Sequence, residues 1–198
     1  HNLAIATCPM PDSEAIKNLK TYLSNMKSIA VEFKQTDKRG NSAEGMLVID
    51  KPYKFRCNYY EPFPMLIVGN KNYVAVYDFE MEHFSRIKAQ ENIFHFLLVD
   101  EINLDSQFKV LSDKDTKDIY EVDIYNEDLG RTTKISFNKI SKQIEKIIIL
   151  EDDNEITIAL GKTRILTFVE NKLFILQDPE IFDAPKKLKK NDIEKMIR

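Results

Sequence analysis

The side chains best able to do chemistry are few in this chain and lie far apart in the sequence. Of the three histidines, His1, His83 and His95, neither of the two internal ones has a partner at a spacing typical of a metal site. The chain contains no Gly-x-Ser-x-Gly, no glycine-rich phosphate loop and no Cys-x-x-Cys. We therefore expect no catalytic residues, no metal and no cofactor, and predict that the protein is not an enzyme.

Charged residues are abundant but balanced. Carboxylate pairs such as Glu80/Glu82 and Asp152/Asp153 could act as acid and base. Because the chain has 32 acidic residues, however, turns and solvent-exposed surface explain these pairs more simply. The formal net charge of −3 provides no domain-wide positive field to neutralise phosphates, so we expect no binding to nucleic acid.

The two cysteines, Cys8 and Cys57, are too few for a disulfide scaffold. They either form one disulfide in an oxidising compartment or are both free. The stretch "LAIATC" is weakly similar to the motif before a lipid-modified cysteine, although Thr7 fits that motif poorly. We interpret residues 1–11 as an N-terminal extension or tag remnant, and a removed signal peptide would also explain the start without Met.

Hydrophobic periodicity indicates which elements position these side chains. One amphipathic helix is expected near the N-terminus, capped by Asp12 or Ser13. Its apolar stripe has spacings of three and four and consists of Ile16, Leu19, Leu23 and Met26. After this helix the period changes to two. About ten short strands follow, separated by turns, and predict an antiparallel sheet or barrel: 29–34, 45–51, 54–59, 66–69, 74–77, 119–125, 132–137, 144–150, 156–160, 165–169 and 173–176.

Two segments depart from this alternation. Residues 91–101 are apolar almost all round, which predicts a short helix that is either inserted into a core or covers an apolar opening. The tail at 184–198 is basic and weakly helical. We expect it to be a solvated extension, with a contact to anionic lipid headgroups as the alternative.

Several short motifs occur in a characteristic order. A strand ends in Phe33-Lys34-Gln35, and a later stretch contains Gly45, Leu47, Lys51-Pro52, Phe55-Arg56, Tyr59 and Pro62. A hairpin at 66–78, the apolar segment at 93–98 and a late Pro179 follow. Across roughly residues 16–183 this order resembles the outer-membrane lipoprotein carrier protein (LolA) family of Gram-negative bacteria.

The resemblance implies a mainly β fold with an α lid. The sheet would be an incomplete, unclosed antiparallel β-barrel enclosing a hydrophobic cavity, covered by the N-terminal amphipathic helix and the short apolar helix. A single carrier domain would span residues 12–183, between the extension at 1–11 and the basic tail at 184–198.

Alternation together with the resemblance identifies the expected site residues. The cavity wall, which would bind acyl chains, is expected to consist of Val31, Phe33, Leu47, Ile49, Phe55, Cys57 and Tyr59. The lid helices would contribute Ile16, Leu19, Leu23, Met26, Ile93, Phe96 and Leu97, the last three filling the cavity when it is empty.

Two residues differ from the family pattern. The family commonly has an arginine where this chain has Lys51, and that arginine hydrogen-bonds the lid to the barrel. Lys51 keeps the charge but lacks the planar fork, so we expect a looser latch to backbone carbonyls of the lid. Cys57 replaces a common Trp, which would enlarge the cavity or allow a disulfide with Cys8.

The function implied by the resemblance is that of a periplasmic chaperone. It would bind lipoprotein acyl chains and shuttle them from an inner-membrane ABC transporter to an outer-membrane lipoprotein receptor. We expect a monomer that makes only transient contacts with membrane proteins. The alternatives are a lipid-anchored outer-membrane receptor of the same fold, or a periplasmic lipid-sensing or scaffold module that does not transport.

Overall fold

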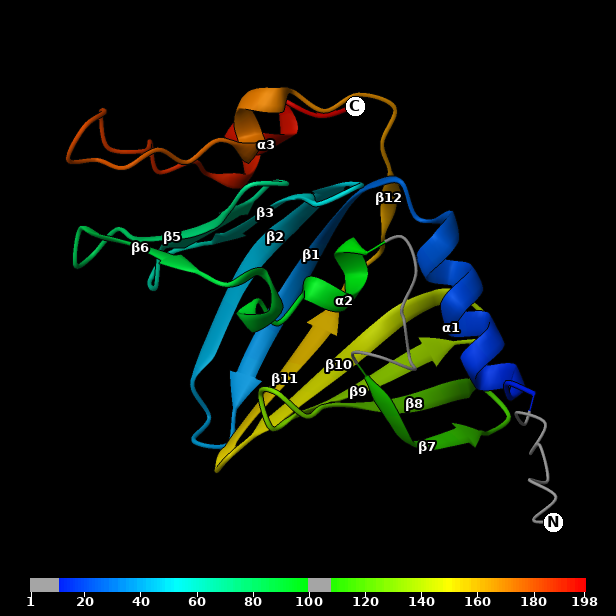
Figure 1. Ribbon diagram of the computed structural model, residues 1–198. Coiled ribbons are helices and arrows are strands. Elements are labelled where there is room, and N and C mark those ends of the chain that lie inside the picture. Colours follow the sequence, from blue (N-terminus) through cyan, green and yellow to red (C-terminus); the bar gives the residue numbers. More distant parts are fainter. Residues whose placement is uncertain (1–10, 100–107) are drawn as a thin grey trace, which may run out of the picture.

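The computed structural model describes residues 11–99 and 108–198 of the chain. Within these residues, twelve strands form one antiparallel sheet in the order β6-β5-β4-β3-β2-β1-β11-β10-β9-β8-β7, with β12 paired to β1 (Figure 1). Strands β6 and β7 are the two ends of this order, so the described part of the sheet is not closed into a barrel. The predicted unclosed antiparallel fold with few helices is confirmed.

The strands have the following bounds: β1 Ser28–Asp37, β2 Ser42–Asp50, β3 Lys54–Tyr59, β4 Met65–Gly69, β5 Val74–Asp78, β6 His83–Ile87, β7 Lys109–Asp115, β8 Ile119–Asn126, β9 Arg131–Asn138, β10 Gln143–Glu151, β11 Asn154–Leu160 and β12 Arg164–Ile165. The helices are α1 Glu14–Asn25, the 3₁₀ turn η1 Ala89–Glu91, α2 His95–Leu98, the 3₁₀ turn η2 Asn171–Phe174 and α3 Lys190–Glu194. No helix of the described residues is long and apolar enough to cross a lipid bilayer.

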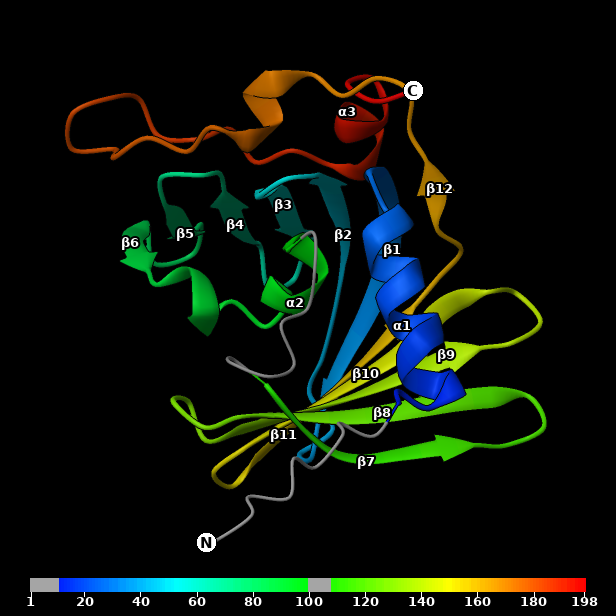
Figure 2. The ribbon, with the colours of Figure 1, turned by 45° about the vertical axis from the view of Figure 1, so that its right-hand side comes forward.

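The sheet carries an apolar core on each face. Along β2, Leu47 and Ile49 point into one core, while Met46 and Val48 point into the other. This follows from the two-residue period of a strand, which sends neighbouring side chains to opposite faces. We call the first the inner core, since α1 and α2 cover it, and the second the outer core, which the C-terminal segment covers (Figures 1 and 2).

Helix α1 forms where the apolar stripe predicts it. The side chain of Ser13 accepts a hydrogen bond of 3.3 Å from the backbone N–H of Ile16, which caps the first turn. Leu19 and Leu23 are buried, and the helix packs against β7 and β8. Asp12, the other candidate cap, instead forms an ion pair of 2.7 Å with Lys20.

Several predicted elements differ from those observed. The expected helix in 91–101 is only the four-residue α2, preceded by η1. The expected strand at 173–176 is the 3₁₀ turn η2, and that at 165–169 is reduced to the two residues of β12. The segment at 173–176 lies over the outer face of the sheet, where Leu173 and Phe174 are buried consecutively and do not alternate. Strands β6 and β7 were not predicted.

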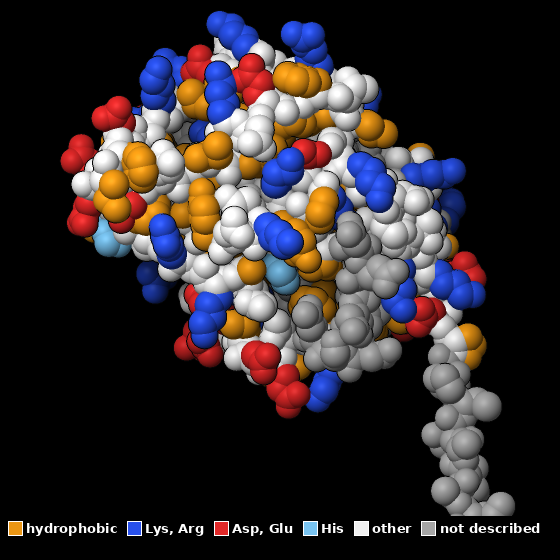
Figure 3. Space-filling view, turned by 45° about the horizontal axis from the view of Figure 1, so that its top comes forward, with side chains coloured by type: hydrophobic (Ala, Val, Ile, Leu, Met, Phe, Trp, Pro, Cys, Tyr) orange, Lys and Arg blue, Asp and Glu red, His pale blue; other side chains and the backbone are white. Residues whose placement is uncertain are grey.

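The expectation of a solvated C-terminal tail is wrong. Ile193 of α3 is fully buried in the outer core, and Ile197 is nearly so. The backbone N–H of Arg198 donates to the carbonyl of Phe168 at 2.9 Å, closing the tail against the preceding segment. Two apolar side chains four residues apart therefore anchor the tail, while its lysines are exposed. Lys and Arg side chains are spread over the face of the molecule that Figure 3 shows. The contact with lipid headgroups and the domain limits stay predictions.

Candidate functional site

All seven residues predicted to form the cavity wall lie together on the inner face of the sheet. They come from β1, β2 and β3, which are neighbours in the sheet, and each is buried: Val31, Phe33, Leu47, Ile49, Phe55, Cys57 and Tyr59. The rings of Phe33 and Tyr59 meet edge to face, with centroids 5.3 Å apart. The sequence therefore located one continuous apolar surface.

The predicted lid residues cover this surface. Ile16 and Ile93 are partly exposed and pack against the inner core. The other five are buried in it: Leu19, Leu23, Met26, Phe96 and Leu97. In this arrangement the lid side chains occupy the concave face, so an acyl-binding cavity there stays a prediction. Phe94 was not among the predicted residues, yet it is fully buried with its ring centroid 5.8 Å from that of Phe33.

Lys51 joins the sheet to both parts of the lid. It directly follows β2, and its ammonium donates to the carbonyl of Leu23 in α1 at 2.5 Å and to that of Val99, just after α2, at 3.0 Å. Two backbone carbonyls near helix C-termini are favourable partners for a cation, because these ends carry partial negative charge. The contacts are those expected of a latch, although the latch role itself stays a proposal.

Cys57 is a free thiol that is fully buried beneath the lid. Burial raises its pKa far above the ordinary value, so the thiol is protonated. Burial likewise raises the pKa of Tyr59, whose hydroxyl donates to the side-chain carbonyl of Gln35 at 2.9 Å. Cys8, the partner considered for a disulfide, lies outside the described residues.

The titratable residues do not converge on a reactive centre in the described part of the chain. Burial lowers the pKa of His95, which favours the neutral imidazole, and His83 is exposed at the start of β6. His1 lies outside the described residues. No group of three His, Cys, Asp or Glu side chains within 11–99 and 108–198 is arranged to hold a metal ion.

The outer face of β3 carries polar side chains at its buried positions. Arg56 donates through Nε and Nη2 to Oδ1 of Asn58, at 3.2 and 3.0 Å, and through Nη1 to the carbonyl of Leu173 at 3.3 Å. Asn58 in turn donates to the carbonyl of Leu188 at 3.1 Å. Burial lowers the pKa of Arg56 to about 10. These bonds attach the C-terminal segment to the sheet.

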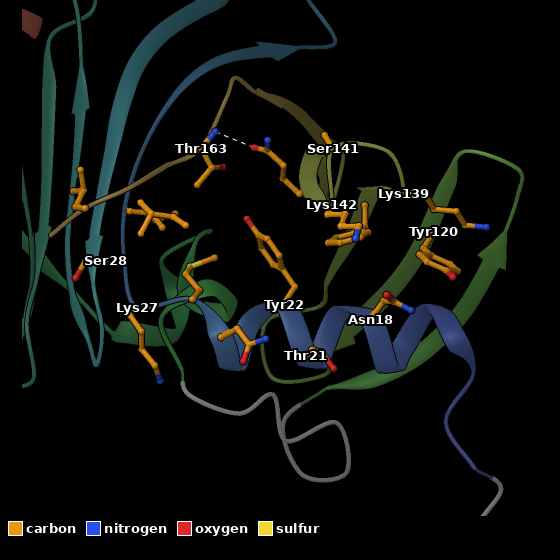
Figure 4. Close-up of a pocket in the computed structure, with 17 residues that line it drawn as sticks. Asn18, Thr21, Tyr22, Lys27, Ser28, Tyr120, Lys139, Ser141, Lys142 and Thr163 are labelled. Carbon is orange, nitrogen blue, oxygen red and sulfur yellow. Dashed lines mark hydrogen bonds between the residues drawn. The ribbon is translucent and has the colours of Figure 1, made fainter. Parts of the chain in front are cut away.

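A pocket of ≈ 720 Å³ opens beside α1 (Figure 4). Its residues come from α1, the start of β1, Tyr120 of β8, the end of β9 with the turn into β10, and the segment around β12. Tyr22 rises from α1 into the pocket, and its ring meets that of Phe137 edge to face at 5.4 Å. Sequence analysis missed this pocket, because five separate segments assemble it.

A sequence profile described as "Outer membrane lipoprotein carrier protein LolA" matches residues 24–177. The chain belongs to the LolA family. The matched range includes every predicted wall residue, the latch lysine and α2, but only the end of α1.

Individual proteins and one solved structure are also similar to this chain. An uncharacterized protein of Rickettsia prowazekii, RP864, is 44% identical over 180 residues, which cover 91% of this chain and 84% of that protein. An outer-membrane lipoprotein carrier protein of Chromobacterium violaceum is 35% identical over 81 residues, 39% of each chain. A LolA superfamily protein of Nitrosomonas europaea, NE2245, shares the fold with a TM-score of 0.52 at 9% identity, covering 83% of this chain and 99% of that one.

Proposed function

We propose that this LolA-family protein is a periplasmic carrier that binds the acyl chains of lipoproteins between its lid and the inner face of its sheet. In this proposal it accepts them from an inner-membrane ABC transporter and delivers them to a receptor at the outer membrane. The observation that carries the proposal is the double hydrogen bond of Lys51, which fastens α1 and the end of α2 over the inner core. The names of the curated relatives support the same class of cargo.

The energetics of such a carrier favour an apolar surface that the lid side chains cover when no cargo is bound. Removing a sixteen-carbon acyl chain from water is worth about 12 kcal/mol, at about 0.8 kcal/mol per methylene. Cargo must first displace Leu23, Phe96 and the other lid side chains, whose own apolar contacts are then lost. The net binding free energy is the gain from burying the acyl chain minus the loss from exposing the lid side chains. This difference keeps binding strong enough to shield the acyl chain from water and weak enough to release it.

The proposal is tested by replacing the latch. Lys51→Leu is expected either to retain bound lipoprotein or to fail in transfer, because the lid can no longer return to its closed position. Lys51→Arg should keep transfer, since it restores a cation with more donors. Lys38→Leu, in the exposed turn after β1, is the matched control for loss of a lysine.

Transfer is measured as the amount of lipoprotein passed from spheroplasts to outer-membrane fractions. Normal transfer kinetics in Lys51→Leu would remove the latch from the mechanism. Mass spectrometry of natively produced protein adds a second test, because acylation at Cys8 would identify a membrane-anchored receptor in place of a soluble carrier.

A further inference from the structure

The segment at 88–99, which carries η1 and α2, lies between the β2–β6 half and the β7–β11 half of the sheet (Figures 1 and 2). It directly follows β6, the strand at one end of the sheet order. Near the other end of that order it meets residues 126–133 of the β8–β9 hairpin, with a hollow of only ≈ 20 Å³ left between them. Lys51 holds the last residue of the segment, Val99, and the beginning of the segment has an attachment of its own.

Arg131, the first residue of β9, makes that attachment. Its Nη1 donates to the backbone carbonyl of Gln90 in η1, at 3.4 Å. The backbone hydrogen bonds within this part of the segment end on other carbonyls, those of Lys88, Ala89 and Asn92. The carbonyl of Gln90 instead accepts from the far half of the sheet, so the bond joins two parts of the molecule that are 41 residues apart in the sequence.

The neighbouring strand holds the guanidinium of Arg131 in place. Nε and Nη2 donate to Oε2 of Glu151, at 3.0 and 2.9 Å, and the two residues are directly paired across β9 and β10. The side chain of Arg131 is only 11% exposed, so water screens this ion pair less than an ordinary surface pair. An arginine suits the position because its planar fork has enough donors for both partners. Two of its nitrogens are fixed by the sheet, and the third is directed at the lid.

We propose that Arg131 is a second positioning residue of the lid, which clasps the beginning of the 88–99 segment to β9 while Lys51 holds its end. Both attachments must then release before the inner core opens. The inference rests on the proposed carrier function and deepens it, because it names what regulates access to the same site. A lid tied to both halves of an unclosed sheet also keeps the two halves together while no cargo is bound.

Hydrogen exchange of the lid amides tests this clasp. The amides of Asn92 and His95 donate to the carbonyls of Ala89 and Asn92, so their exchange reports opening of the segment. Arg131→Met should speed their exchange about threefold, because the bond that is lost is partly exposed and long. The amide of Arg198, which closes the outer cover, should exchange as before. Unchanged lid amides, or an equal increase at Arg198, would overturn the proposal.

Two further variants separate the clasp from the ion pair. Glu151→Gln removes the charge but keeps an amide oxygen that accepts from the guanidinium, so the lid amides should exchange at the parent rate. Arg131→Lys is the second variant if Arg131→Met unfolds. It keeps a cation for Glu151 but lacks the planar fork that reaches Gln90 as well, so it should also speed exchange. Exchange in Glu151→Gln as fast as in Arg131→Met would assign the effect to the ion pair and overturn the clasp.

Alkylation of Cys57, which is buried beneath the lid, measures whether the two attachments resist the same opening. In a Cys8→Ser background that carries Lys51→Met, adding Arg131→Met should speed labelling about threefold again, because the contributions of separate sites add. Equal labelling with and without Arg131→Met would overturn the proposal.

The same variants distinguish this inference from the function on which it rests. Unchanged lid amides in Arg131→Met, together with normal lipoprotein transfer by the parent protein, would reject the clasp alone. Faster lid amides, together with absent lipoprotein binding by the parent protein, would reject the carrier function alone.

Discussion

The two faces of strands β2 and β3 hold their covering segments in different ways. On the inner face, Lys51 attaches these strands to the lid through hydrogen bonds to the carbonyls of Leu23 in α1 and Val99 just after α2. On the outer face, Arg56 and Asn58 bond to carbonyls at both ends of the C-terminal segment, and the hydroxyl of Tyr73 accepts from the N–H of Leu176 at 3.3 Å.

This difference assigns motion to one face and rigidity to the other. A cover whose polar attachment to β2 and β3 runs through a half-buried lysine can open locally at a lower cost, because fewer buried polar interactions are lost. A cover held along its length by buried side chains leaves unpaired donors and carbonyls when it lifts, which costs much more. In the proposed carrier, the inner core would be the side that opens to cargo, and the outer core would keep the sheet in shape while it does so.

The largest effect is expected in the outer core. Phe174→Ala removes a buried ring from η2 and should lower the free energy of unfolding by about 3–5 kcal/mol. Urea titration followed by circular dichroism measures it, with Phe63→Ala, a half-exposed phenylalanine, as the control within about 0.5 kcal/mol. A loss below 1 kcal/mol would mean that the outer cover does not support the sheet.

A methyl group at Gly69 should produce the next largest effect. A Cβ at this position would stand 2.1 Å from Cε1 of Phe55, whose ring is fully buried in the inner core. Gly69→Ala should therefore cost about 1–3 kcal/mol. The second substitution Phe55→Leu should recover part of that loss, because it vacates the ring positions. Simple addition of the two single costs would show that the clash is absent.

Opening of the lid can be measured through the thiol beneath it. In a Cys8→Ser background, alkylation of buried Cys57 requires local opening. Lys51→Met removes hydrogen bonds worth about 1 kcal/mol, so labelling should become about fivefold faster while global stability changes little. Unchanged labelling would show that Lys51 does not hold the lid. The outer-face variant Phe174→Ala should differ by lowering the midpoint of global unfolding as well.

The smallest predicted effect is on the pH dependence of stability. Burial raises the pKa of Cys57, so the unfolded chain releases this proton at a lower pH than the native protein does. Its contribution is complete below about pH 9 and is lost above it, by about 1 kcal/mol between pH 9 and 10. Urea midpoints across this range should fall in the parent protein and fall less steeply in Cys57→Ala. Equal slopes would place the thiol in contact with water.

The sequence located the inner face because its signals are local. Alternation in β2 and β3 placed Leu47, Ile49 and Phe55 on one face, and the order of motifs marked Lys51. The outer core had no comparable signal. The apolar sequence at 173–176 was interpreted as a strand, but Leu173 and Phe174 are buried consecutively in a 3₁₀ turn. Ile193 and Ile197 were not singled out, because the tail was interpreted from its many lysines as a solvated extension.

The alternation of β3 has a consequence for how this protein can diversify. Positions 55, 57 and 59 carry side chains that face the lid, whereas positions 56 and 58 carry those that bond to the C-terminal segment. The lid-facing positions can therefore change with the ligand, whereas the outer-face positions are constrained because they hold the C-terminal segment in place. Within a single six-residue strand, adaptable and constrained positions thereby alternate residue by residue.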